Sequence, residues 1–241
     1  MDGQFNFIFR ACVECNQRKA IAERHVSSVT LFNSPARAEG EHADMEALRK
    51  ARNDYHPRKK GVLVKDSQEQ LTLTGRFGGA SISVGMVGPP QPDKDMLGEV
   101  AFSHIQGLFS LLTTEDYLVE QKMRLLPQHH FIWYDSYSYE DWGNPQAVEL
   151  ATRVQSWKCA ANIESAQGFF RAILRINENG IWFWALEWNR QMRLVGGISD
   201  KRMAVFEDLP NEGWMPTPNG RMRENIPLKS EDDILFIGEV A

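Results

Sequence analysis

The spacing of apolar residues changes period along the chain, and each period predicts an element. Helical spacing over residues 96–112 sets Leu97, Val100, Ala101, Ile105, Leu108 and Leu112 on one side. Residues 169–176 and 181–188 are apolar runs that flank the turn sequence Asn-Glu-Asn-Gly. These patterns predict an amphipathic helix over 96–112 and a β-hairpin over 169–188, with a third strand over 193–198.

Weaker patterns fill the rest of the second half. Residues 131–134 predict a strand, and residues 117–126 predict a helix that Pro127 ends. Asn144 and Pro145 predict the start of another helix, because proline fits the first helical turn. We expect this helix to run to about Cys159.

The predicted hairpin is rich in tryptophan and flanked by charged residues. Alternation puts Trp182, Trp184 and Trp188 on one face, which we interpret as core beneath helices rather than as a base-stacking platform. Four arginines lie around the hairpin, and they either pair with Glu178 and Glu187 or bind a phosphate or carboxylate: Arg171, Arg175, Arg190 and Arg193.

The first half has shorter and more polar patterns. We expect a helix over residues 16–24, a β-branched strand or helix exit over 26–32, and a polar helix over 39–53. A basic loop at 58–61 precedes short segments at 62–64, 71–74 and 81–84, which predict a small antiparallel sheet. Residues 75–79 are interpreted as a hairpin turn.

Three prolines within residues 89–92 mark a boundary between two parts. The predicted fold class is α+β. Residues 1–88 form an N-terminal region with a small antiparallel sheet, and residues 93–241 form a domain of helices packed on an antiparallel sheet.

Composition narrows the classes of function. The chain of 241 residues carries a net charge of -5, so contact with DNA is expected only through the basic residues between positions 10 and 60. No apolar run approaches the roughly 20 residues that span a bilayer, so no membrane association is expected. Three cysteines and no signal peptide predict a cytoplasmic protein with reduced thiols.

The densest group of reactive residues lies near the N-terminus. Cys12 and Cys15 form a Cys-x-x-Cys pair, which Asn6 precedes and Asn16 and Lys19 follow. Two thiolates supply half of the four ligands of a closed structural zinc site. The pattern Cys-x-x-Cys-Asn-x-x-Lys with an upstream Asn resembles the second half of the motif of HNH endonucleases, the ββα-metal or His-Me finger family.

This resemblance implies a role for each matching residue. Cys12 and Cys15 would be structural zinc ligands in a ββα remnant, and Asn6 would orient the catalytic base. Asn16 would lie near a catalytic divalent metal such as magnesium, which stabilises charge on the phosphate. The residues expected to face DNA phosphates are Arg10, Arg18, Lys19 and Arg24.

The chain departs from the family pattern in three respects. No Cys-x-x-Cys and no histidine precede Cys12, and the spacing from Asn6 to Cys12 is one residue longer than the family pattern. We therefore expect a truncated HNH-like nuclease with a zinc half-site, inactive in phosphodiester hydrolysis as it stands. One alternative leaves Cys12 and Cys15 unliganded at a helix start, and a redox dithiol is disfavoured because no strand–helix–strand pattern surrounds them.

A second function from another class is a non-catalytic binding or regulatory module that recognises a protein or small ligand through the C-terminal domain. Its candidate ligand residues lie in a polar and aromatic segment at 134–144, expected to be a loop: Tyr134, Asp135, Tyr137, Asp141 and Trp142. The other interpretation of this segment is a connector pinned to the core. His25 is interpreted as a packing residue, and adjacent His129 and His130 are not expected to share a metal.

Overall fold

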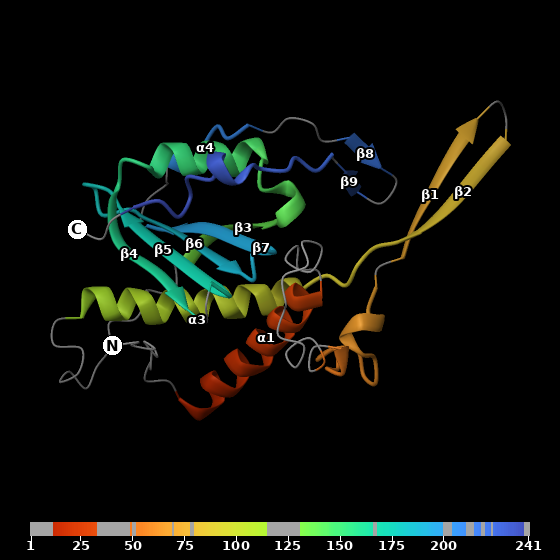
Figure 1. Ribbon diagram of the computed structural model, residues 1–241, viewed down its shortest axis with the longest axis horizontal. Helices are drawn as coiled ribbons and strands as arrows, with labels where there is room; N and C mark the ends of the chain where they lie inside the picture. The colour runs from red at the N-terminus through yellow and green to blue at the C-terminus, as the bar shows by residue number, and fades with distance from the viewer. Residues whose placement is uncertain are drawn as a thin grey trace.

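A five-stranded antiparallel sheet is the centre of the fold (Figure 1). The computed structural model describes residues 12–32, 49, 52–68, 70–77, 80–114, 131–165, 168–199, 204–210, 215–217, 220–222 and 224–238. The strand order is β3-β7-β6-β5-β4. The strands are β3 (Phe131–Ser138), β4 (Lys158–Ser165), β5 (Phe170–Ile176), β6 (Trp182–Trp188) and β7 (Met192–Ile198). The predicted hairpin and its third strand are confirmed as β5, β6 and β7.

Helix α3 (Lys94–Thr113) covers one face of this sheet (Figure 1). The Asp93 side chain caps the helix, accepting hydrogen bonds from the backbone N–H groups of Asp95 and Met96 at 3.0 and 3.2 Å. The apolar face of α3 packs in one core cluster with Trp184 and Trp188 of β6. The predicted helix over 96–112 and the core position of the tryptophans are therefore confirmed.

Helix α4 (Pro145–Val154) covers the opposite face of the sheet. Leu150 and Val154 pack there with Phe183 and Ala185, the alternate residues of β6. The predicted start of this helix is confirmed, with Asn144 as its cap, but the predicted end is wrong. The helix ends at Val154, and Cys159 belongs to β4, where it is buried and pairs with Arg175 of β5.

Helix α1 (Val13–Phe32) runs without a break through the segment at 26–32 that the sequence predicts as a strand or a helix exit. Val26, Val29 and Thr30 are buried, and Val26 joins the core cluster of α3. Packing on α3 outweighs the small helix penalty of β-branched residues, which is a few tenths of a kcal/mol each. That prediction was therefore wrong.

Between α1 and α3, the elements named among the described residues are one short 3-10 helix and a hairpin. The predicted strand at 62–64 is replaced by an isolated bridge between Tyr55 and Leu63, followed by η2 (Val64–Asp66). Strands β1 (Gln70–Phe77) and β2 (Ala80–Val87) form a two-stranded antiparallel hairpin, as the patterns at 71–74 and 81–84 predict. This hairpin projects away from the central sheet in Figure 1.

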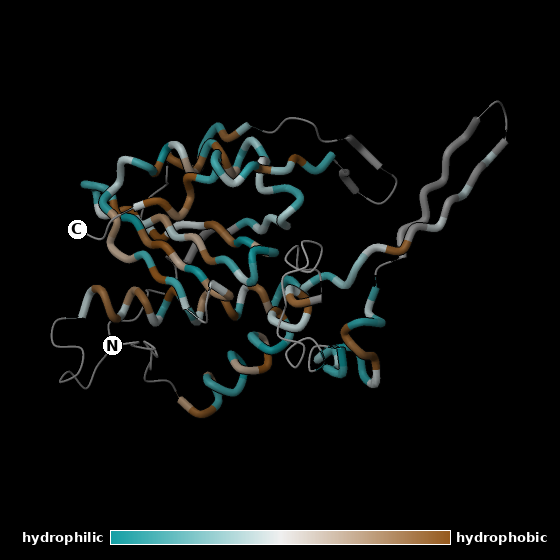
Figure 2. The backbone as a smooth tube through the Cα atoms, viewed as in Figure 1, coloured by the Kyte–Doolittle hydropathy of each residue, from teal (hydrophilic) through white to brown (hydrophobic). Residues whose placement is uncertain are grey.

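The described residues include further short elements. These are η3 (Tyr139–Asp141), η4 (Ala204–Phe206), η5 (Ser230–Asp232), and the small pair β8 (Met215–Thr217) and β9 (Gly220–Met222). The predicted helix at 117–126 and most of that at 39–53 lie outside the described residues. Figure 2 shows apolar residues gathered in the central sheet and in α3. The α+β class is confirmed, and no described helix meets the length and hydropathy that a bilayer crossing requires.

Candidate functional site

Cys12 and Cys15 lie at the start of the 20-residue helix α1, and both side chains are exposed. The backbone N–H of Cys15 donates a hydrogen bond to Sγ of Cys12 over 3.1 Å. The hydrogen bond from the Cys15 thiol, supported by this N–H, lowers the pKa of Cys12 below its usual value. The same interaction raises the pKa of Cys15. Cys12 is therefore the more acidic thiol of the pair, as expected for a cysteine at a helix N-terminus.

Of the other residues of the predicted nuclease site, some belong to the part of the chain that the structure describes and some do not. Asn16 lies exposed in the first turn of α1, one position after Cys15. Asn6 and Arg10 lie outside the described residues. The base-orienting role of Asn6 and the metal-proximal role of Asn16 stay predictions.

The basic residues of α1 have carboxylate partners. Arg18 pairs with Glu99 of α3 at 3.6 Å, and Lys19 pairs with Glu23 at 3.1 Å. Arg24 pairs with Asp54 at 3.4 Å. Exposed pairs of this kind contribute about 0–1 kcal/mol, so a phosphate could displace the carboxylates. The predicted phosphate contacts of these residues remain untested.

His25 is buried inside the fold, away from the thiols. Its Nε2 accepts a hydrogen bond from the backbone N–H of Asp93 at 3.0 Å, and its ring meets that of His56 at 4.8 Å. Burial lowers the pKa of His25 to about 4, so the ring is neutral at pH 7. His25 lies ten positions after Cys15 along α1, a rise of about 15 Å. His25 therefore joins α1 to the start of α3 and does not share a metal with the thiols.

The structure describes no cluster of three or more metal-ligating side chains among the residues it places. The thiol pair on α1 has two ligands, so zinc held there needs further ligands from outside the described residues. Cys12 and Cys15 are both exposed, and the lowered pKa of Cys12 favours the thiolate form that binds zinc, so this pair suits two of the four ligand positions of a zinc site.

The predicted ligand loop at 134–144 is a strand and a turn. Tyr134 and Asp135 belong to β3, where they pair with Gly196 and Val195 of β7. The Tyr137 hydroxyl donates to the Asp135 carboxylate at 3.2 Å, and the Tyr137 ring is buried. The loop prediction is therefore wrong, because the alternating residues of this segment continue the sheet edge.

Asp141 and Trp142 of the same segment are also used within the fold. Asp141 Oδ2 accepts from the Asn144 side chain at 3.3 Å, and its Oδ1 accepts from the backbone of Ile226 at 3.3 Å. Trp142 is 8% exposed and packs against Tyr139. These contacts support the interpretation of the segment as a connector pinned to the core.

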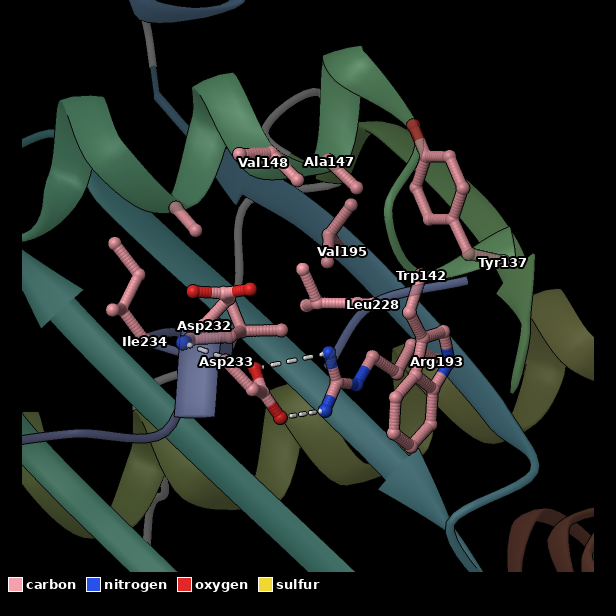
Figure 3. A pocket seen from close by; sticks show the side chains of 12 residues that line it. Tyr137, Trp142, Ala147, Val148, Arg193, Val195, Leu228, Asp232, Asp233 and Ile234 are labelled. Carbon is pink, nitrogen blue, oxygen red and sulfur yellow. Dashed lines mark hydrogen bonds and ion pairs between the residues drawn. The ribbon is translucent and has the colours of Figure 1, made fainter. Parts of the chain in front are cut away.

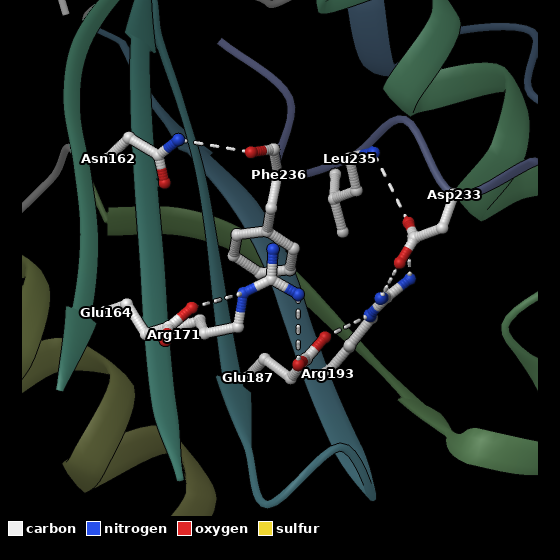
Figure 4. A network of polar contacts seen from close by, with 8 residues as sticks. All are labelled: Asn162, Glu164, Arg171, Glu187, Arg193, Asp233, Leu235 and Phe236. Atoms are coloured by element: carbon white, nitrogen blue, oxygen red, sulfur yellow. Dashed lines mark hydrogen bonds and ion pairs between the residues drawn. The ribbon is translucent and has the colours of Figure 1, made fainter. Parts of the chain in front are cut away.

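A row of alternating charges crosses the face of the sheet that α4 covers (Figure 4). The strand register places Glu164, Arg171, Glu187 and Arg193 side by side on β4, β5, β6 and β7. Glu187, 1% exposed, pairs with Arg193 at 2.7 Å and with Arg171 at 3.5 Å. The predicted pairing with Glu187 is confirmed for Arg171 and Arg193, whereas Arg175 binds backbone carbonyl oxygens instead.

Arg193 lies at the β7 end of this row and is 4% exposed. Both of its terminal nitrogens bind the Asp233 carboxylate, and its guanidinium carbon lies 3.4 Å from the centre of the Trp142 ring (Figure 3). Beside it, apolar residues of α4 and of the segment after residue 227 enclose a cavity of about 40 Å³. That volume holds about one water molecule, so the cavity is a packing gap rather than a ligand site.

The segment at 233–238, which we name the strap, is held against the sheet by hydrogen bonds from polar side chains of β4 and β5. Arg175 donates to the carbonyl oxygens of Gln155, Trp157 and Ile237. Asn162 donates to the carbonyls of Phe236 and Gly238, each at 3.1 Å, and the Phe236 ring lies 4.2 Å from the Arg171 guanidinium. The sequence signal for the strap is only an apolar run after three acidic residues, which does not indicate its arginine partners.

An open hollow of about 800 Å³ lies between the loop that carries His56, the proline-rich segment and the start of α3. Its charged lining residues are Arg58, Lys59, Asp93, Lys94 and Asp95. Arg58 binds Asp93 and Asp95 across it at 3.3 and 2.7 Å. The sequence predicts only the basic loop at one side of this hollow.

Comparison of the chain with models of known families, with curated proteins and with solved structures gives no match. The functional interpretation therefore rests on the residues and their geometry.

Proposed function

We propose that the start of α1 is half of a structural zinc site in an HNH-type endonuclease. The observation that carries this proposal is the hydrogen bond from the Cys15 N–H to Sγ of Cys12 at 3.1 Å. Such a bond stabilises a thiolate at Cys12, which is the form that ligates zinc. The two remaining ligands would come from outside the described residues.

In this proposal the helix after the zinc pair presents Asn16 toward the catalytic metal, and Arg18, Lys19 and Arg24 exchange carboxylate partners for DNA phosphates. Magnesium bound there would stabilise charge on the phosphate and the leaving oxygen. The described part of the chain offers no general base at this position, since His25 is buried and bound to Asp93. We therefore expect the 241-residue chain to be inactive on DNA.

Zinc content tests the structural half of the proposal. The purified chain should hold zinc, measured by inductively coupled plasma mass spectrometry after desalting, and Cys12→Ser should lose it. Cys159→Ser is the matched control, because Cys159 is buried in β4 and distant from α1. Zinc-free wild-type protein would contradict the zinc half-site.

A nuclease assay tests the catalytic half. Incubation of supercoiled plasmid with the chain and magnesium should give no cleavage above the no-protein control. Cleavage that Asn6→Ala removes would show that the chain contains a complete site, and the expectation of inactivity would be wrong.

The second candidate function is a non-catalytic binding module, and the open hollow at the start of α3 favours it. Its volume of about 800 Å³ is in the range of small-molecule sites. Its lining places cationic and anionic groups together, which suits a polar ligand. Metal-free protein whose stability is unchanged by Cys12→Ser would favour this function over the first.

A further inference from the structure

Cys12 holds the N-cap position of α1, and its sulfur is the capping atom. The Cys12 carbonyl oxygen accepts a hydrogen bond from the backbone N–H of Asn16 at 2.9 Å, which belongs to the first turn of the helix. Sγ of Cys12 accepts one from the backbone N–H of Cys15, the third helical residue, at 3.1 Å. In most helices an oxygen atom of the N-cap side chain makes this bond. The cap therefore holds the Cys12 sulfur beside the residue that carries the second thiol.

The two thiols are also in contact with each other. The Cys15 thiol donates a hydrogen bond to Sγ of Cys12. Cys15 follows Cys12 by three positions, and in an α-helix this spacing sets two Cα atoms about 5 Å apart. Disulfides bridge Cα atoms that lie about 4.4–6.8 Å apart. The start of α1 therefore holds the pair at the separation of a disulfide without a change in the backbone.

The start of α1 leaves both sulfurs open to reagents in solution. Cys12 and Cys15 are exposed, and Val13 between them is 76% exposed. The residues of α1 that join the core cluster of α3 come later, at Ala22 and Val26. Figure 1 shows the first turns of α1 extending away from α3. An oxidant can therefore reach the pair while the protein stays folded.

We propose that Cys12 and Cys15 form a reversible disulfide by exchange with the disulfides of small thiols, such as glutathione disulfide. The surrounding elements do not form the strand–helix–strand pattern of dedicated redox proteins, but a disulfide needs only contact and access. Zinc is not needed for this exchange. Where the pair also binds zinc, the disulfide removes both thiolate ligands, so oxidation and zinc binding exclude each other.

The exchange has two steps. The thiolate of Cys12 attacks one sulfur of glutathione disulfide, whose S–S bond breaks, and the departing glutathione takes up the proton that Cys12 lost. The sulfur of Cys15 then attacks that of Cys12 in the mixed disulfide. The internal S–S bond forms, and the second glutathione leaves with the proton of Cys15. The dithiol loses two electrons, which reduce glutathione disulfide to two glutathione thiols.

The geometry gives each cysteine its own step. The N–H of Cys15 points at the Cys12 sulfur and stabilises negative charge there, so Cys12 makes the first attack. Cys15 already lies in contact with that sulfur, and groups held in contact react as if at a far higher concentration than a free reagent. The mixed disulfide should therefore be resolved by Cys15 before a second glutathione binds.

Intact-mass spectrometry of chelator-treated protein in a series of glutathione redox buffers tests the disulfide. Wild-type protein should lose the mass of two hydrogen atoms, and this form should exceed the glutathione adduct at least tenfold. Cys15→Ser should stop at one glutathione bound to Cys12. Cys159→Ser is the matched control and should behave as the wild type, because Cys159 is buried in β4. Dithiothreitol should restore the starting mass.

Wild-type protein that keeps both thiols free across the series overturns the proposal, as does accumulation of glutathione on both cysteines or a disulfide between two chains. Zinc content, measured separately, distinguishes this result from the zinc half-site. Zinc-free protein that forms the internal disulfide supports the exchange and contradicts the zinc proposal. Zinc-loaded protein should release its zinc to a chromogenic chelator as the disulfide forms, and a disulfide that forms with zinc retained would show that other groups hold the metal.

Discussion

Glu187 and Arg193 form an ion pair of 2.7 Å inside the fold, where the two side chains are 1% and 4% exposed. Arg193 also binds Asp233 of the strap and lies over Trp142. The pair therefore joins two strands of the sheet to the segment that closes its α4 face. Removal of one partner from a buried ion pair strongly destabilises the folded state, because the other charge stays buried without compensation.

Glu187→Gln should lower the free energy of unfolding by about 3–5 kcal/mol, because it leaves a buried guanidinium with one carboxylate fewer. Urea unfolding followed by tryptophan fluorescence measures the loss. Glu178→Gln, in the exposed turn between β5 and β6, should change stability by about 0.5 kcal/mol or less. Equal effects of the two substitutions would contradict a structural role for the buried pair.

Acid should weaken the protein through His25. Burial is the main cause that lowers the pKa of His25 from the ordinary 6.5 to about 4, and the charges of His56 and Arg58 lower it further. The carboxylates of Asp93 and Asp54 raise this pKa and offset part of the effect. The unfolded chain takes up the proton first, so stability is full above pH 6.5 and falls as the pH decreases toward 4. From pH 7 to pH 5 the loss assigned to His25 is about 2 kcal/mol.

Unfolding curves at pH 7 and pH 5 measure this dependence. His25→Gln keeps an acceptor for the Asp93 N–H and removes the titration, so its stability should decrease less between the two pH values than that of the wild type. His56, whose pKa burial also lowers, contributes in the same direction in both proteins. Parallel pH dependences of variant and wild type would assign the acid sensitivity to other groups.

The three thiols should differ in reactivity. Cys12 has a lowered pKa and is exposed, whereas the pKa of Cys15 is raised by its interaction with Cys12. Burial raises the pKa of Cys159 in β4 and shields its sulfur. Iodoacetamide at pH 7, added to chelator-treated protein, should modify Cys12 several-fold faster than Cys15, and Cys159 only on unfolding. Peptide mass spectrometry over time gives the order, and equal rates at the first two would refute the asymmetry.

Two glycines provide a matched test of packing. A Cβ at Gly143 would lie 2.7 Å from the carbonyl oxygen of Pro227 and 2.8 Å from that of Ile226, whereas a Cβ at Gly85 meets nothing within 4 Å. Gly143→Ala should therefore destabilise by about 1–3 kcal/mol through overpacking. Gly85→Ala should be neutral or stabilise by about 0.4–1 kcal/mol. Thermal unfolding compares them, and a neutral Gly143→Ala would mean that residues 226 and 227 move away freely.

The central sheet and α3 were predictable from the sequence because local pattern and tertiary environment agree there. Trp184 and Phe183 alternate between the two faces of β6, and each face has its own helix. Val26 and Val29 were predicted wrongly because their β-branched side chains favour strands locally, while the buried side of α1 needs apolar residues of any shape. Tertiary contacts decide such segments.

The candidate site was predictable only in part. The thiol pair is visible as a short motif, and its position at the start of a helix follows from the good helix formers after it. The partners of Arg24 and Arg193 are distant in sequence, at Asp54 and Asp233, so spacing gives no sign of them. Tyr137 and Trp142 have the composition of a ligand loop. Alternation along β3 takes the Tyr137 ring into the core, and the turn after η3 does the same for Trp142.

The strap has a consequence for the order in which the protein folds during synthesis. Residues 233–238 leave the ribosome after every strand of the central sheet. Until then Arg193 lacks its Asp233 partner, and the carbonyl of Ile237 is not available to Arg175. A nascent chain paused before residue 233 therefore has all five strands but an unfinished α4 face, and translation past the strap is the step that allows this half of the core to close.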